Sequence, residues 1–128
     1  MDVMAELRPI GALYTAGELR MAIEKTHLLW GMIPEPKENI PNAYLVVEYG
    51  VALSIKIDDL DQAQEWADQA PPFALKRHDM GEVEFLVGKV AFERGELDKA
   101  RSQFLIANVK SEGRIFEDAD ERYVRLIR

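Results

Sequence analysis

One short pattern occurs three times along this chain of 128 residues, and it constrains the fold more than any other feature. The pattern consists of a glycine or aspartate, an acid, Leu, two mostly polar residues and Ala. It spans residues 17–22, 58–63 and 95–100, so its three leucines lie 41 and then 37 residues apart. Self-similarity at a period of roughly 20 to 50 residues is typical of stacked helical hairpins. The sequence therefore predicts an all-α fold of stacked antiparallel hairpins, about three in number.

Each copy of the pattern has the chemistry of a turn that leads into a helix. Gly17 and Gly95 can adopt the positive φ that ends a helix, and we expect Asp58 to cap the following helix with its carboxylate. The acid that comes next interacts favourably with the positive end of a helix dipole. Leu and Ala, three residues apart, then begin an apolar face, which in the third copy continues through Phe104 and Ala107.

The third copy resembles a tetratricopeptide repeat. The small, turn and packing residues of that family have counterparts at the family's spacing in Gly88, Gly95, Ala100, Phe104 and Ala107. The family's large aromatic residue in the first helix is displaced, because Ala91 occupies its place and Phe92 is the neighbour. The resemblance implies stacked hairpins that serve as a protein-binding scaffold.

The other two copies follow the family pattern less closely. The second unit keeps Ala63 and Ala70, but Gly50 is one residue out of register and Asp58 replaces the turn glycine. The first unit keeps Gly17, Ala22 and Pro34. The units are therefore degenerate, and the chain is tetratricopeptide-like.

The periodicity of apolar residues predicts six longer helices and a short C-terminal capping helix. Pro9 should interrupt or kink the first helix, Thr15 and Glu18 should form a capping box for the second, and Asp118 should cap the last. A loop with three prolines spans residues 34–41. The expected helices cover residues 2–14, 16–32, 42–56, 59–70, 80–94, 96–110 and 119–127.

Size and composition predict a single domain over residues 1–128. The chain contains no cysteine, which excludes thiolate metal sites and disulfides and makes a cytoplasmic location the default. The sequence offers neither a signal peptide nor a run of about 18 apolar residues for a membrane helix. The formal net charge of −7 opposes binding to nucleic acid or anionic lipid.

Motifs for catalysis, cofactors and metal ions are missing from the sequence. Neither His27 nor His78 has a carboxylate or a second histidine at a convincing metal-ligand spacing. We expect a partly buried structural role for His27 and a solvated loop position for His78. The glycines do not form a phosphate-binding loop, and the serines lack the context of a nucleophile elbow. We therefore expect a protein that is not an enzyme and needs no cofactor. An enzyme with a hidden carboxylate pair would need a deep pocket.

Five acids without a Lys or Arg lie between residues 58 and 68. Asp61, Glu65 and Asp68 follow steps of four and three residues, which places them on one helix face. Trp66 is offset from the stripe of small alanines, so it is either an exposed anchor for a cationic partner or part of the core. Residues Asp58, Asp61, Glu65, Trp66 and Asp68 form the candidate partner-binding site, and a merely solubilising acidic face is the alternative.

Resemblance refines the expected function to an immunity protein. Residues 66–73, 81–88 and 110–117 look like parts of small tetratricopeptide-like bacterial proteins associated with polymorphic toxin loci. This resemblance implies a cytoplasmic inhibitor that binds a secreted polymorphic or contact-dependent toxin, and the acids would meet a basic toxin domain. The alternative is a secretion chaperone or adaptor that holds an extended peptide in a concave groove.

Overall fold

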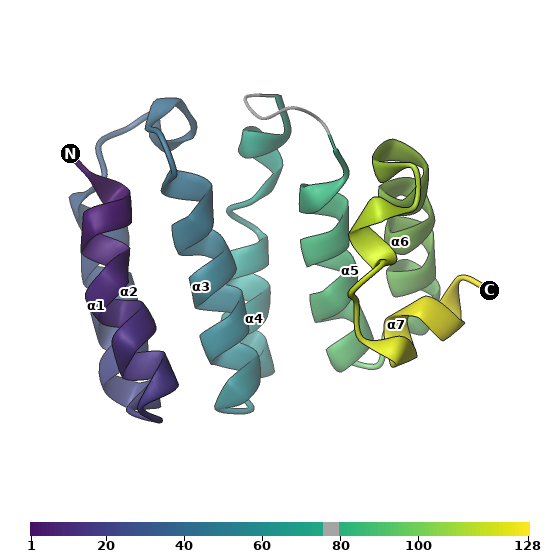
Figure 1. Ribbon diagram of the computed structural model, residues 1–128, viewed down its shortest axis with the longest axis horizontal. Helices are drawn as coiled ribbons and strands as arrows, with labels where there is room; N and C mark the ends of the chain where they lie inside the picture. The colour runs from purple at the N-terminus through teal and green to yellow at the C-terminus, as the bar shows by residue number, and fades with distance from the viewer. Residues whose placement is uncertain (76–79) are drawn as a thin grey trace. The chain divides into compact units, whose positions relative to one another are not determined.

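The computed structural model describes residues 1–75 and 80–128, and these residues form seven α-helices, three short 3-10 helices and no strand (Figure 1). The predicted all-α class is confirmed. The chain divides into two compact units, Met1–Gln69 and Ala70–Arg128. The expectation of a single domain stays a prediction. The α-helices are α1 Val3–Thr15, α2 Leu19–Met32, α3 Ala43–Lys56, α4 Leu60–Ala67, α5 Glu82–Glu93, α6 Leu97–Ser111 and α7 Glu121–Leu126.

In the first unit, α1 to α4 pack one against the next in antiparallel order (Figure 1). The 3-10 helix η1, Lys37–Asn39, lies in the proline-rich connection between α2 and α3. Helix α1 continues through Pro9, so the interruption predicted there is wrong, and the alternative of a kink stays a prediction. Pro9 and Ala5 are both exposed, which lets water solvate the Ala5 carbonyl that lacks its helical donor. The buried core includes Val3, Leu7, Ile10, Ala22, Leu29, Tyr44, Val47 and Val51.

The same turn joins the two helices in each of three hairpins. Gly17, Asp58 and Gly95 adopt φ values of 79°, 59° and 81°. The next residue in each turn donates its amide to a carbonyl five residues earlier, at 2.9 Å, and then begins the following helix as its N-cap. A bond of this kind, after a residue with positive φ, is characteristic of a Schellman motif, which satisfies carbonyl groups at the end of a helix. The positive φ expected of Gly17 and Gly95 is confirmed.

Two predicted caps in these turns are wrong. Asp58 takes the left-handed position itself, and the cap is Asp59, whose Oδ1 accepts the Gln62 amide at 3.1 Å. Thr15 is still part of α1 and donates its hydroxyl to the Gly11 carbonyl at 3.1 Å, so the capping box with Glu18 does not form. Helix α4 also ends at Ala67, three residues before the predicted end, since Pro71 and Pro72 begin the 3-10 helix η2, Pro71–Leu75.

The two neighbouring acids of the second turn should respond oppositely to substitution. Asp58→Gly should raise the free energy of unfolding by about 0.5–1 kcal/mol, because glycine tolerates positive φ. Asp59→Ala should lower it by about 1 kcal/mol through loss of the N-cap. Urea unfolding followed by circular dichroism measures both. The same sign for both variants would contradict this description of the turn.

Glycines hold the hairpin helices close together at two places. An added Cβ on Gly50 would lie 2.1 Å from the Trp66 ring, and one on Gly88 would lie 2.5 Å from the Phe104 ring. Each glycine of α3 or α5 thus receives an aromatic ring from the helix that follows it. The alanine of each turn pattern also belongs to the core, because Ala22, Ala63 and Ala100 are fully buried.

In the second unit, the C-terminal segment covers the α5–α6 hairpin. Phe116 of the 3-10 helix η3, Arg114–Phe116, and Tyr123 and Val124 of α7 join a buried cluster with Phe104 and Ala107. The predicted capping helix over 119–127 is therefore present as α7. Its N-cap is Asp120, not the predicted Asp118, and Asp120 Oδ1 accepts the Arg122 amide at 2.9 Å.

Glu93 connects α5 to α7. Its Oε1 accepts a hydrogen bond from the Tyr123 hydroxyl at 2.9 Å and one from Arg122 at 3.0 Å. Burial raises the pKa of Tyr123 well above its usual range, and the bond to the Glu93 carboxylate adds to the effect. Hydrogen bonds from the Arg122 side chain and backbone lower the pKa of Asp120. These contacts fix α7 on the hairpin.

The raised pKa of Tyr123 predicts a loss of stability in alkali. The folded chain keeps the phenol proton to higher pH than the unfolded chain, so this contribution is present below about pH 10 and is lost as pH rises above it. Tyr123→Phe should therefore cost about 1 kcal/mol at pH 8 and less at pH 11, as measured by urea unfolding. If Tyr123→Phe changes the free energy of unfolding equally at both pH values, the pKa of Tyr123 is not raised in the folded chain.

Candidate functional site

Three acids of the candidate site lie together on one side of α4. Asp61, Glu65 and Asp68 are all exposed, and the helical spacing of four and three residues aligns them. We name this set the α4 acidic face. Asp61 lies in the first turn, where the helix dipole favours it, whereas Asp68 is at the C-terminal end and accepts a hydrogen bond from Gln64 at 2.8 Å. The face therefore exposes three carboxylates to solvent.

Asp58 and Trp66 differ from the other three residues of the candidate site. Asp58 is exposed, but it belongs to the turn before α4. Trp66 is only 3% exposed, so it belongs to the core and cannot serve as an exposed anchor. Its ring lies on Gly50, 4.9 Å from the His27 ring and 5.8 Å from the Trp30 ring, measured between centroids. Of the two alternatives expected for Trp66, the structure therefore confirms burial in the core.

A small hollow lies between α2 and α4 beside Trp66. It has a volume of about 150 Å³ and is lined by His27, Trp30, Glu65, Trp66 and Gln69. His27 is exposed, contrary to the partial burial expected for it, and its Nε2 is 2.6 Å from Gln62 Oε1. Within the described residues, the buried Nε1 of Trp66 has no hydrogen-bond partner. His78 lies outside the described residues.

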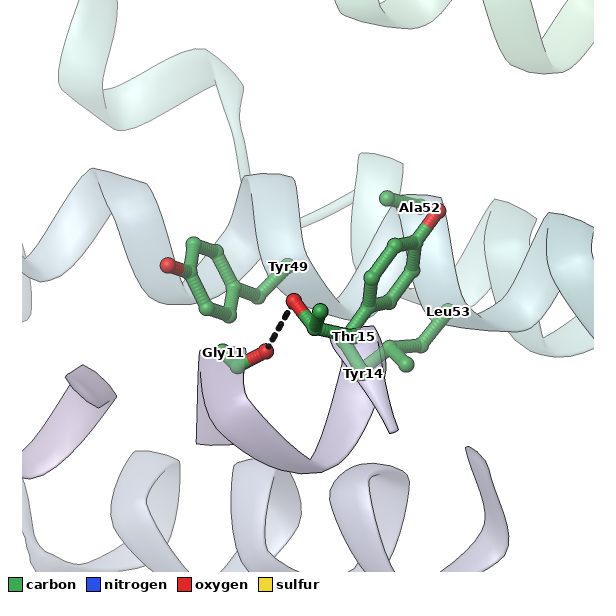
Figure 2. Close-up of a pocket in the computed structure, with 6 residues that line it drawn as sticks. All are labelled: Gly11, Tyr14, Thr15, Tyr49, Ala52 and Leu53. Atoms are coloured by element: carbon green, nitrogen blue, oxygen red, sulfur yellow. Dashed lines mark hydrogen bonds between the residues drawn. The ribbon is translucent and has the colours of Figure 1, made fainter. Parts of the chain in front are cut away.

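A second surface, which is not among the predicted binding sites, is a groove between α1 and α3 (Figure 2). Its volume is about 320 Å³, and none of its lining residues is charged. The rings of Tyr14 and Tyr49 stand at two sides of the groove, with Thr15 between them. Tyr14 is 40% exposed, and the Tyr49 hydroxyl would lie 3.5 Å from a Cβ added to Gly11. The lining residues are Gly11, Tyr14, Thr15, Tyr49, Ala52 and Leu53.

The groove is lined mostly by apolar atoms, and its two tyrosines add hydroxyl groups. Tyrosine rings supply apolar contact area at low entropic cost, and their hydroxyl groups can bond a peptide backbone. A weak sequence signal for the groove exists, since Gly11 and Ala52 are small residues on predicted helices, but only the packing of α1 beside α3 brings them together. Among the described residues, no three His, Asp or Glu side chains come together as a metal site.

The helices of the described residues lack the combination of length and apolar character needed to cross a membrane. Comparison with known protein families, curated proteins and solved structures found no match.

Proposed function

We propose that this chain is a non-catalytic, protein-binding protein made of about three degenerate tetratricopeptide-like hairpins, with α7 as the capping helix. Two features support the repeat. The same Schellman turn joins each helix pair, and Ala22, Ala63 and Ala100 hold equivalent, fully buried places after it. Hairpin repeats expose large surfaces relative to their cores, and these surfaces are used for binding.

We propose further that it acts in the cytoplasm as an immunity protein, which binds a secreted polymorphic or contact-dependent toxin and blocks its active site. The α4 acidic face is the observation that carries this proposal. Asp61, Glu65 and Asp68 are exposed on one side of one helix, which is the arrangement that a basic cleft would recognise. The formal net charge of −7 adds long-range attraction to a basic toxin domain.

A secretion chaperone or adaptor is the second candidate, and the α1–α3 groove favours it. Such a protein would hold an extended peptide between Tyr14 and Tyr49, and apolar contact would dominate the binding. Salt separates the two candidates, because charge-driven capture weakens as ionic strength rises whereas apolar burial does not.

The α4 acidic face can be tested by reversing its charge. The change of Asp61, Glu65 and Asp68 together to Lys should weaken binding of the co-purified toxin domain by about a hundredfold at low salt, because three attractive contacts become repulsive. Isothermal titration calorimetry measures the affinity, and growth of toxin-producing cells measures protection. Circular dichroism checks that the helix content is unchanged.

A matched variant controls for overall charge. Glu24, Glu117 and Asp118 are exposed acids on other parts of the chain, and their joint change to Lys should reduce the affinity far less. A second variant, Ala52→Arg, fills the α1–α3 groove. If Ala52→Arg abolishes binding while the acidic-face variant binds normally, the chaperone or adaptor is the correct function.

A further inference from the structure

An apolar stripe on α2 faces water. Met21, Leu28 and Met32 are 48%, 69% and 60% exposed, and their spacing of seven and four residues places them on one side of the helix. Exposed apolar residues that gather on one side of a helix are candidates for an interaction surface.

Helix α1 contributes the other half of this surface. A hollow of about 170 Å³ runs between α1 and α2, with Glu6 and Pro9 from α1 and Lys25, Leu28 and Met32 from α2 among its lining residues. The hollow lies on the side of α1 away from the α1–α3 groove, because helical spacing turns Glu6 and Pro9 away from Gly11 and Thr15. We name Glu6, Pro9, Lys25, Leu28 and Met32 the outer α1–α2 surface.

Charge identifies what would cover this surface. It carries one acid, Glu6, on α1 and one base, Lys25, on α2, and both line the same hollow. A two-fold axis parallel to the helices would place each α1 opposite the α2 of a second copy, and these two helices would be antiparallel, as α1 and α2 are within one chain. Each Glu6 would then face the partner's Lys25, on both sides of a shared apolar centre made by Leu28 and Met32.

We propose that the outer α1–α2 surface is the interface of a two-fold symmetric homodimer. The surface is complementary to itself both in charge and in apolar character, as an isologous contact requires. In the second unit, α7 and η3 lie over the core of α5 and α6, although Val109 of α6 also faces water. The dimer is independent of the proposed toxin binding, since the α4 acidic face is made by a different helix.

The test is sedimentation velocity of the full chain between about 1 and 100 µM, the range in which weak homodimers dissociate. The unchanged chain should sediment as a dimer at the upper end. Leu28→Glu should raise the dimer dissociation constant at least about tenfold, because it places a charge without a partner in the apolar centre. Val109→Glu is the control, since Val109 is 77% exposed on α6, and it should leave the dimer intact.

A charge-reversal cycle tests the two-fold arrangement itself. Lys25→Glu alone and Glu6→Lys alone should each weaken the dimer, whereas the two changes in one chain should restore it. The proposal is overturned if the chain stays monomeric at about 100 µM. It is also overturned if Leu28→Glu leaves the dimer dissociation constant unchanged. A dimer that both single reversals leave unchanged, or that the double reversal fails to restore, overturns the facing of Glu6 and Lys25.

Discussion

The contact of a glycine with an aromatic ring sets the helix packing in two of the three hairpins. Gly50 receives the ring of Trp66, and Gly88 receives the ring of Phe104, each at a distance that leaves no room for a Cβ. Sixteen residues separate the glycine from its aromatic partner in both cases. Close packing of this kind fixes how each helix is rotated about its axis. With Trp66 turned into the core, Asp61, Glu65 and Asp68 of the same helix face water.

The recurring turn and the helices could be predicted from the sequence because local chemistry determines them. Positive φ at Gly17 and Gly95 follows from the residue type, and apolar periodicity gives every α-helix to within a few residues. Asp58 and Asp59 could not be told apart, since aspartate suits both the left-handed position and the N-cap. The burial of Trp66 depends on its contact with Gly50. Relative to the pattern of the third copy, Gly50 is shifted by one residue, and the aromatic residue that contacts it is shifted by one residue as well.

Surfaces that are made by two helices could not be predicted without the tertiary structure. The α4 acidic face follows from spacing within one helix, so its shared orientation could be predicted. The α1–α3 groove and the outer α1–α2 surface are each made by two helices, and no single segment shows that Tyr14 lies near Tyr49 or that Glu6 lies near Lys25. The hydrogen bonds of Glu93 to α7 could not be predicted from the sequence either, because about thirty residues separate the partners. A protein-binding role therefore depends on packing that sequence patterns indicate only in outline.

A double-mutant cycle at Gly50 and Trp66 tests the central packing contact most directly. Gly50→Ala should lower the free energy of unfolding by about 1–3 kcal/mol in the unchanged chain, where the new Cβ meets the ring. With Trp66→Leu in the background, the same change should cost much less, because alanine is a better helix former than glycine and the obstacle is gone. Gly31→Ala, at a glycine with nothing within 4 Å, should stabilise in both backgrounds. If Gly50→Ala lowered the free energy of unfolding equally with and without Trp66, the contact between Gly50 and Trp66 would not set the packing of these helices.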